Sequence, residues 1–145
     1  EDRERLIRYI DFMEQELSDF PKFSKVEWRI YNEDRDMRRN LERWIENIVN
    51  CSIDIAKVIL ASKERKIPTT YKEALKELGS IPPFDEGFGK SISEWTTLRN
   101  ILAHEYLDMR WTSIKKFLKT AEPIYKQLVE TIRRFLHSTE EESSG

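Results

Sequence analysis

The residues with the clearest chemical potential lie close together near position 100. The chain carries Arg99, Asn100, His104 and Tyr106 within one short stretch. A histidine can exchange protons near neutral pH, and an arginine can hold a phosphate and stabilise the charge of a transition state. A tyrosine can stack on a base or donate to a phosphate. These side chains suit cleavage of an RNA phosphodiester without a metal ion, with the RNA 2′-hydroxyl as the nucleophile.

The spacing of these residues limits how one helix can present them. An α-helix turns about 100° per residue, so Asn100 and His104 lie on one side. The amide of Asn100 can therefore bond the imidazole and fix its tautomer. Arg99 and Tyr106 share a second side, and Arg99 diverges from His104 by roughly 140°. The two converge only if the helix loosens near Leu102 to His104, or if a partner chain supplies the missing group.

The other reactive side chains favour structural roles. His137 falls at the expected end of the last helix, where the helix dipole favours a cation. Cys51, the one cysteine, lies in an apolar helical pattern and is interpreted as a core residue. The sequence has no CxxC or HExxH pattern, so we expect neither a metal site nor a cofactor.

Length and composition indicate one helical domain. The chain has 145 residues, of which 39% are hydrophobic, 36% are charged and only 4 are glycine, which favours long helices over strands and turns. The net charge of −2 excludes binding of nucleic acid by the whole surface, so an RNA substrate would need a local basic patch, which dimerisation could assemble. No apolar run is long enough for a membrane span and no signal peptide is present, so we expect a cytoplasmic protein.

Apolar residues recur at helical spacing along most of the chain, which predicts an all-α fold. The expected architecture is an up-down bundle of four principal helices with one or two short extra helices. The principal helices are expected at 5–17, at about 34–66, after a capping box at Ser91 and Glu94, and at about 112–136, where Pro123 should kink the helix or open a new turn. Short helices should follow capping boxes at Ser24 with Glu27 and at Thr70 with Glu73. Residues 1–137 form the predicted domain, and 138–145 form a predicted disordered tail.

A line of polar residues runs along the long helix beside its apolar seam. It includes Asn40, Arg43 and Asn47, and asparagine is a weak helix former that a solvated face normally avoids. The line is therefore either a solvated face or the wall of a site or interface. The candidate wall residues are Arg39, Asn40, Arg43 and Asn47.

The string Arg99-Asn100-x-x-x-His104-x-Tyr106 resembles the RNxxxHxY signature of HepT-like toxins of the HEPN superfamily. The partners of these toxins are MntA-type minimal nucleotidyltransferase antitoxins. The run from Arg39 to Arg43, the short helix at 71–75 and the helix order also resemble the family, over about residues 4–136. The segment 22–31 is longer than in a minimal HepT.

The resemblance implies a homodimer whose two motifs face a shared cleft. It implies a metal-independent endoribonuclease toxin of a type VII-like toxin–antitoxin pair that cleaves cellular RNA. Arg99 and His104 match the catalytic pair of the family, and Asn100 matches the supporting residue. Tyr106 matches the tyrosine that the antitoxin AMPylates to silence the toxin. The antitoxin would supply ATP and Mg²⁺, so neither is a cofactor of this chain.

Two alternatives stay open at this point. In the first, the chain is a non-catalytic HEPN companion that serves as a substrate-binding subunit of a nucleotidyltransferase, and Arg99 and His104 bind phosphate without cutting RNA. In the second, the chain is a helical interaction module whose motif only packs or caps a helix. An imidazole enclosed by leucine and isoleucine, with its nitrogens bonded to backbone, would favour the second. Two copies of Arg99 and His104 lining one solvent-reachable cleft across a two-fold axis would favour the nuclease.

Overall fold

The computed structural model describes the backbone of residues 2–144 and the side chains of residues 2–138. Over these residues the chain is helical and contains no strand, which confirms the all-α prediction. The elements are α1 (Asp2–Leu17), α2 (Phe20–Phe23), α3 (Trp28–Glu33), α4 (Arg35–Ser62), α5 (Tyr71–Leu78), α6 (Glu86–Glu94), the 3₁₀ turn η1 (Trp95–Thr97), α7 (Leu98–His104), α8 (Leu107–Thr120) and α9 (Glu122–Ser144). No helix in the described part of the chain is both long and apolar enough to cross a membrane.

Side-chain caps define where several helices begin. The carboxylate of Asp34 accepts from the Met37 N–H at 3.0 Å and opens α4. The hydroxyl of Thr70 accepts from the Glu73 N–H at 3.1 Å, as its capping box predicts. These bonds satisfy N–H groups that have no partner inside the helix.

Two of the predicted capping boxes are wrong. Helix α6 begins after Asp85, whose carboxylate accepts from the Phe88 N–H at 2.8 Å, and Ser91 lies inside that helix. Ser24 ends α2 instead of starting a helix, and α3 begins after Glu27 without a side-chain cap. In both places a serine three residues before a glutamate matches the pattern, but the chain is already helical or already turning there.

The long C-terminal segment forms two helices instead of one. Helix α8 ends at Thr120 and α9 starts at Glu122, so Pro123 occupies the first turn of a new helix. Of the two predicted effects of Pro123, a kink or a new helical turn, the structure has the second. Proline is tolerated there because the first-turn N–H groups have no helical acceptor. The prediction of a disordered tail at 138–145 falls largely outside the residues whose side chains are described, and it stays a prediction.

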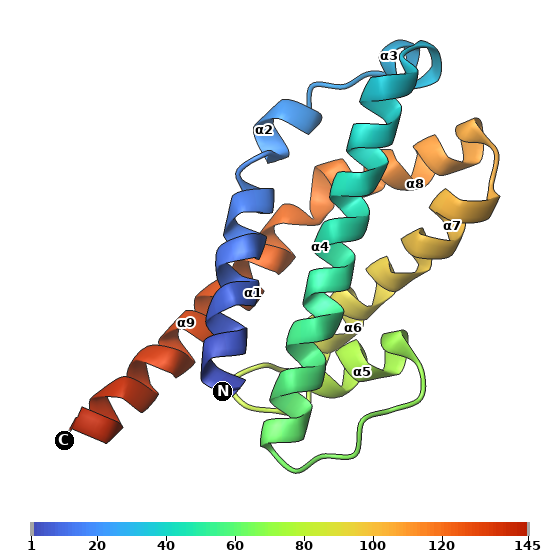
Figure 1. Ribbon diagram of the computed structural model, residues 1–145. Helices are drawn as coiled ribbons and strands as arrows, with labels where there is room; N and C mark the ends of the chain where they lie inside the picture. Colours follow the sequence, from blue (N-terminus) through green and yellow to red (C-terminus); the bar gives the residue numbers. More distant parts are fainter. Residues whose placement is uncertain (1, 145) are drawn as a thin grey trace.

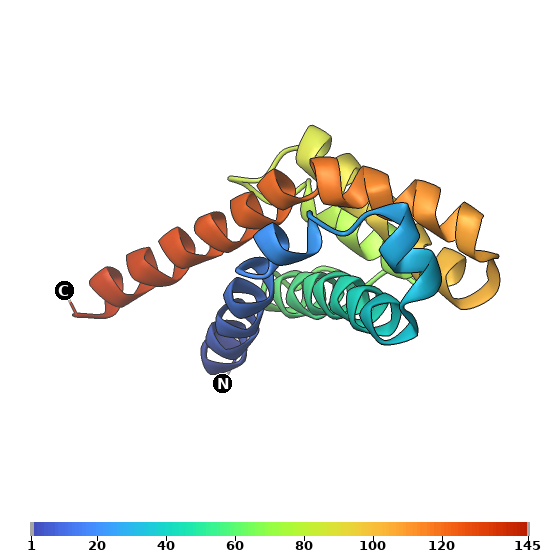
Figure 2. The same ribbon diagram turned by 90° about the horizontal axis from the view of Figure 1, so that it is seen from above.

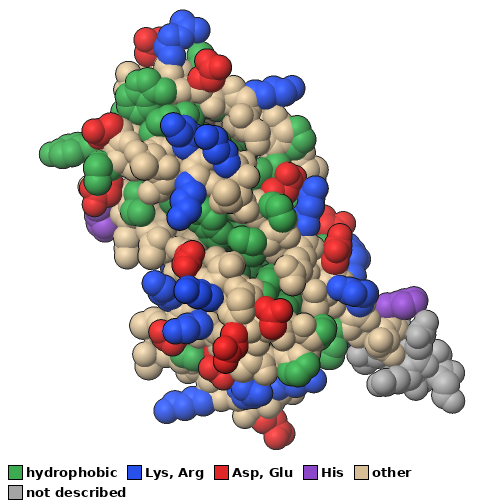
Figure 3. Space-filling model, turned by 180° about the vertical axis from the view of Figure 1, so that it is seen from behind, with side chains coloured by type: hydrophobic (Ala, Val, Ile, Leu, Met, Phe, Trp, Pro, Cys, Tyr) green, Lys and Arg blue, Asp and Glu red, His purple; other side chains and the backbone are tan. Residues whose placement is uncertain are grey.

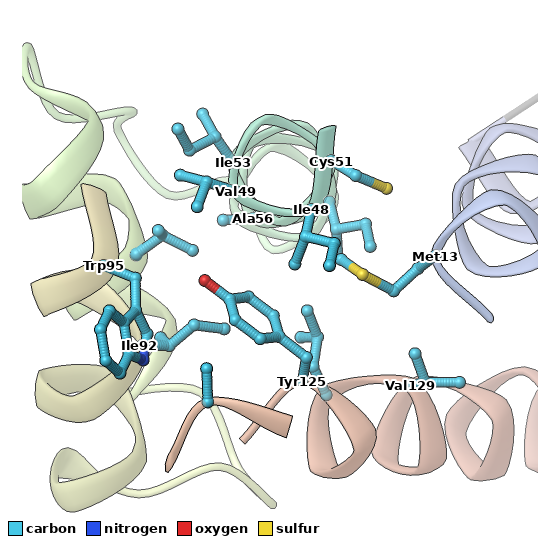
Figure 4. Packing of buried hydrophobic residues seen from close by; sticks show 14 of the residues in the cluster. Met13, Ile48, Val49, Cys51, Ile53, Ala56, Ile92, Trp95, Tyr125 and Val129 are labelled. Atoms are coloured by element: carbon cyan, nitrogen blue, oxygen red, sulfur yellow. The ribbon is translucent and has the colours of Figure 1, made fainter. Parts of the chain in front are cut away.

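Helix α4 is the central element of the bundle. Helix α1 lies along one side of it, α6 and α7 lie on the other side, and α8 and α9 cross behind (Figures 1 and 2). Tyr125 of α9 is fully buried and points between α4 and Trp95 (Figure 4). The ring of Phe117 on α8 packs edge-on against Trp44 of α4 at 5.8 Å and against Trp95 at 5.3 Å between centroids. This aromatic packing ties α4 and α8 to the segment that leads into α7.

The backbones of α5 and α6 are in direct contact because glycines, which have no side chain, occupy the point of closest approach. A Cβ added to Gly89 would lie 2.6 Å from the Lys76 carbonyl oxygen and 3.0 Å from the Gly79 Cα. A Cβ added to Gly79 would lie 2.6 Å from the Asp85 carbonyl oxygen. The contact fixes α5, and with it Tyr71 at the start of that helix, relative to the α6–α7 segment.

This close approach predicts that Gly89→Ala destabilises the fold by about 1–3 kcal/mol, because the new methyl group must push one backbone away from the other. Gly87 is the matched control in the same helix. A Cβ there meets only the Asp85 Oδ1 at 3.5 Å, so Gly87→Ala should leave stability unchanged or raise it by less than about 1 kcal/mol. Urea unfolding followed by circular dichroism measures both, and equal stability of the two variants would contradict the assigned contact.

Candidate active site

Helix α7 carries the motif and presents it to solvent. Leu98 and Leu102 are buried and anchor the helix on the core. Arg99 is half-buried, while Asn100 and His104 are exposed. The imidazole is therefore outside the apolar core, which argues against the alternative in which the motif only packs.

The chain turns sharply directly after the histidine. Helix α7 ends at His104, and Glu105 (φ −88°, ψ 160°) and Tyr106 (φ −72°, ψ 163°) are extended before α8 begins. The helix is regular from Leu98 to His104, so the break comes too late to rotate the imidazole toward Arg99. On that helix Arg99 and His104 still diverge by roughly 140°.

Arg99 lies against an aromatic ring that a second cation also contacts. Its Cζ is 4.8 Å from the ring centroid of Tyr71, and the Lys57 Nζ is 4.6 Å from the same centroid. Cation–π attraction holds both side chains near one ring. The positive charges of Lys57 on α4 and Arg99 on α7 therefore lie close together at the Tyr71 ring of α5. Such a pair of charges favours an anionic ligand such as a phosphate. Lys57 and Tyr71 are not predicted as site residues from the sequence, because neither belongs to the motif.

Tyr106 projects from the turn into solvent. Its side chain is 85% exposed, and Met109 one turn later on α8 is 56% exposed. The Tyr106 hydroxyl has no hydrogen-bond partner among the described residues. The hydroxyl is therefore accessible to another molecule.

Arg110 of α8 connects the turn at Glu105 and Tyr106 to Glu42 of α4. The Arg110 Nε donates to the Glu105 carbonyl oxygen at 2.7 Å, and its Nη1 lies 3.2 Å from both carboxylate oxygens of Glu42. The Tyr31 hydroxyl donates to Glu42 Oε2 at 2.5 Å. Burial raises the pKa of Tyr31, and the hydrogen bond and charge of Glu42 add to that effect, so the hydroxyl stays a donor. No local pattern of the sequence predicts this pairing, which joins residues on α3, α4 and α8.

A basic groove lies beside α7. It encloses about 340 Å³ between α5, the η1–α7 segment and α8, and its lining includes Lys72, Thr97, Ile101, Ser113 and Lys116, with Glu94 as an acidic member. Seen from behind, lysine and arginine side chains lie in several groups on this face, with acidic side chains between them (Figure 3). The two lysines outweigh the single glutamate in this groove, and Leu98 and Ile101 place it against the motif helix.

The four candidate wall residues on α4 do not share one environment: three are exposed to solvent, and one faces α1. Arg39, Asn40 and Arg43 are exposed. Asn47 is half-buried, and its Nδ2 lies 3.5 Å from Glu16 Oε2 on α1. Helices α1 and α7 lie on opposite sides of α4 (Figures 1 and 2). One chain therefore does not bring Asn47 together with the motif, and the role of all four residues at a site wall stays a prediction.

The family of the chain follows from comparison with known proteins. Residues 13–132 match the family Ribonuclease HepT-like. This chain belongs to the HepT-like ribonuclease family. The resemblance that the motif carries is thereby confirmed.

One curated protein and two solved structures that are similar to this HepT-like chain are described as toxins or nucleases of the same kind. A tRNA nuclease HepT of Aphanizomenon flos-aquae is 29% identical over 136 residues, which cover 94% of this chain and 88% of that protein. Two solved structures share the fold at 15% identity. A mutant MntA–HpeT toxin–antitoxin structure has a TM-score of 0.78, covering 89% of this chain and 97% of that chain. A tri-AMPylated Shewanella oneidensis HEPN toxin in complex with its MNT antitoxin has a TM-score of 0.76, covering 89% and 96%.

The remaining reactive residues of this HepT-like chain lie away from the motif. Cys51 is buried and contacts the Tyr9 carbonyl oxygen at 3.3 Å, as expected of a core residue. Burial raises the pKa of its thiol to about 12, with the charges of Asp54 and Glu16 adding to the effect, so it is not a nucleophile near neutral pH. His137 is exposed on α9. Within the described part of the chain, no three side chains of metal-ligating type come together.

Proposed function

We propose that this HepT-like protein is a metal-independent endoribonuclease toxin that cleaves cellular RNA, with Arg99 and His104 as its catalytic residues. The observation that carries the proposal is a solvent-exposed His104 on the same short helix as an Arg99 that is held beside a second cation. A tRNA is the first substrate to examine, because the relative from Aphanizomenon flos-aquae is named a tRNA nuclease.

The proposed chemistry needs only the RNA and these side chains. His104 removes the proton of the RNA 2′-hydroxyl, and the 2′-oxygen attacks the neighbouring phosphorus. The bond from phosphorus to the 5′-oxygen breaks, leaving a 2′,3′-cyclic phosphate on one product. The proton held by the imidazole passes to the 5′-oxygen of the other product. Arg99 stabilises the negative charge that develops on the phosphoryl oxygens, and Asn100, one turn before His104, orients the imidazole.

The site is proposed to form between two copies of the chain. Arg99 and His104 diverge on α7, which stays helical up to the histidine. A two-fold axis that sets two motifs against one cleft would place the Arg99 of one subunit beside the His104 of its partner. The exposed Met109 next to the motif provides apolar surface for such contact.

Regulation is proposed to act on Tyr106. An MntA-type nucleotidyltransferase antitoxin would bind the cytoplasmic toxin and transfer AMP to the free hydroxyl. The tyrosyl oxygen gives up its proton to solvent and bonds to the α-phosphorus of ATP. The bond from the α-phosphorus to the bridging oxygen breaks, and pyrophosphate leaves with the Mg²⁺ that the antitoxin would supply. The Shewanella oneidensis structure, an AMPylated toxin of this fold in complex with an MNT antitoxin, supports AMP transfer as the form of regulation. The added nucleotide would bring a phosphate charge and bulk two residues from His104, where RNA has to enter.

The net charge of −2 favours one second candidate, a companion subunit that binds a phosphorylated substrate for the nucleotidyltransferase without cutting it. Such a protein needs the Arg99 and Lys57 cations but no proton transfer by His104. The cleavage experiment below separates the two functions, since only the nuclease requires the imidazole for a chemical step.

Purified protein should cut total tRNA in the presence of EDTA. His104→Ala should lower the rate about 10²- to 10⁴-fold, because the proton transfer is lost, and Arg99→Ala about 10²- to 10³-fold. His137→Ala, the other histidine, is the matched control and should retain activity within about twofold. Gel analysis of 5′-labelled tRNA measures the rates. Undiminished cleavage by both motif variants would exclude the catalytic assignment, and dependence on added Mg²⁺ would exclude metal independence.

Incubation with an MntA-type nucleotidyltransferase, ATP and Mg²⁺ should add AMP to Tyr106 and suppress cleavage. Tyr106→Phe should stay unmodified, because it lacks the nucleophilic oxygen, whereas Tyr71→Phe, at the other exposed tyrosine beside the motif, should be modified as in the wild type. Peptide mass spectrometry identifies the modified residue. An adduct on another residue, or full RNA cleavage by AMPylated protein, would refute the regulatory assignment.

A further inference from the structure

We propose that Arg110 and Glu42 form a positioning pair that fixes the turn after His104 in the orientation that catalysis requires. This inference rests on the proposed function, since it deepens the account of the same site. It concerns residues outside the motif, on α8 and α4.

The turn needs such a support because its backbone leaves the helix. Glu105 and Tyr106 are extended, so the Glu105 carbonyl lies between two helices and takes part in neither. Arg110 supplies its hydrogen bond through Nε at 2.7 Å. The backbone N–H of Arg110 also donates to the Tyr106 carbonyl at 2.9 Å. That second bond is the first i→i−4 bond of α8 and needs no arginine, so the side chain is required only for the Glu105 carbonyl.

The guanidinium itself is held rigidly by α4. Its Nη1 contacts both oxygens of Glu42 at 3.2 Å, and the Tyr31 hydroxyl bonds the same carboxylate. The side chains of Arg110 and Glu42 are only 22% and 16% exposed, so water screens the pair less than it screens a surface ion pair. The chain of contacts runs from the core helix α4 to the carbonyl that follows His104.

The geometry of an arginine is required for this arrangement. A guanidinium directs Nε and Nη1 to two acceptors at a fixed angle, whereas a lysine ammonium is a single point charge on a flexible stem. Arg110→Lys can pair with Glu42 but cannot span Glu42 and the Glu105 carbonyl in the same way. A lysine should therefore recover stability and not catalysis.

The test compares tRNA cleavage by wild type, Arg110→Gln, Arg110→Lys, Glu42→Gln and the double glutamine variant. Arg133→Gln is the matched control, because Arg133 bridges α9 to Asp11 and Glu14 on α1, away from the motif. Arg110→Gln should lower kcat about 10- to 100-fold, the cost of small misplacements of catalytic groups, with little change in KM. Arg133→Gln should keep kcat within about twofold.

Two features separate positioning from a general loss of stability. Arg110→Lys should restore the Tm of the wild type while kcat stays low. The double variant should lose no more than about the larger of its two single losses, because Arg110 and Glu42 act as one unit. Recovery of wild-type kcat by Arg110→Lys, or an equal loss in Arg133→Gln, would overturn the proposal.

A second measurement does not depend on nuclease activity. Backbone amide exchange at Glu105, whose N–H donates to the Ile101 carbonyl at 3.0 Å, should accelerate in Arg110→Gln and Glu42→Gln, and not in Arg133→Gln, because the turn has lost its anchor. Unchanged exchange in the first two variants would overturn the positioning role. If the wild type cuts no RNA while exchange responds as expected, the nuclease function fails and the anchoring of the turn stands.

Discussion

The burial of helix α4 is the constraint on which the rest of the structure depends. Thirteen of its 28 residues are buried, and they cover more of its circumference than one neighbouring helix could shield. The other helices therefore have to surround it, with α1 on one side and the α5–α7 segment on the other. Burial of apolar area stabilises this arrangement. The motif helix α7 is one of the helices that cover α4.

The same constraint sets the orientation of the motif. Leu98 and Leu102 turn inward toward the core, so the phase of α7 is fixed and Asn100 and His104 have to face outward. Arg99 falls at the edge between core and solvent, where the Tyr71 ring receives it. Chemistry on this helix is therefore carried by the positions that the core leaves free.

The parts of the fold that apolar periodicity encodes are predictable from the sequence. The apolar repeat of α4 and the role of Pro123 are local properties of the chain, and both appear in the structure. The false caps at Ser24 and Ser91 show the limit of a pattern that does not include the preceding backbone. The motif was identified from its spacing, but Tyr71 and Lys57 meet Arg99 only through tertiary packing. The pairing of Arg110 with Glu42 joins residues 68 positions apart, and no local pattern of the sequence specifies it.

The central claim is that Arg99 of one subunit and His104 of the other form one nuclease site. Mixing equal amounts of Arg99→Ala and His104→Ala protein after subunit exchange tests it directly. Half of the dimers are then mixed, and each has one site with both residues intact, so the account predicts recovery of about one quarter of wild-type tRNA cleavage from two inactive proteins. If the mixture stays as inactive as its components although native mass spectrometry detects mixed dimers, the claim of a shared site is contradicted.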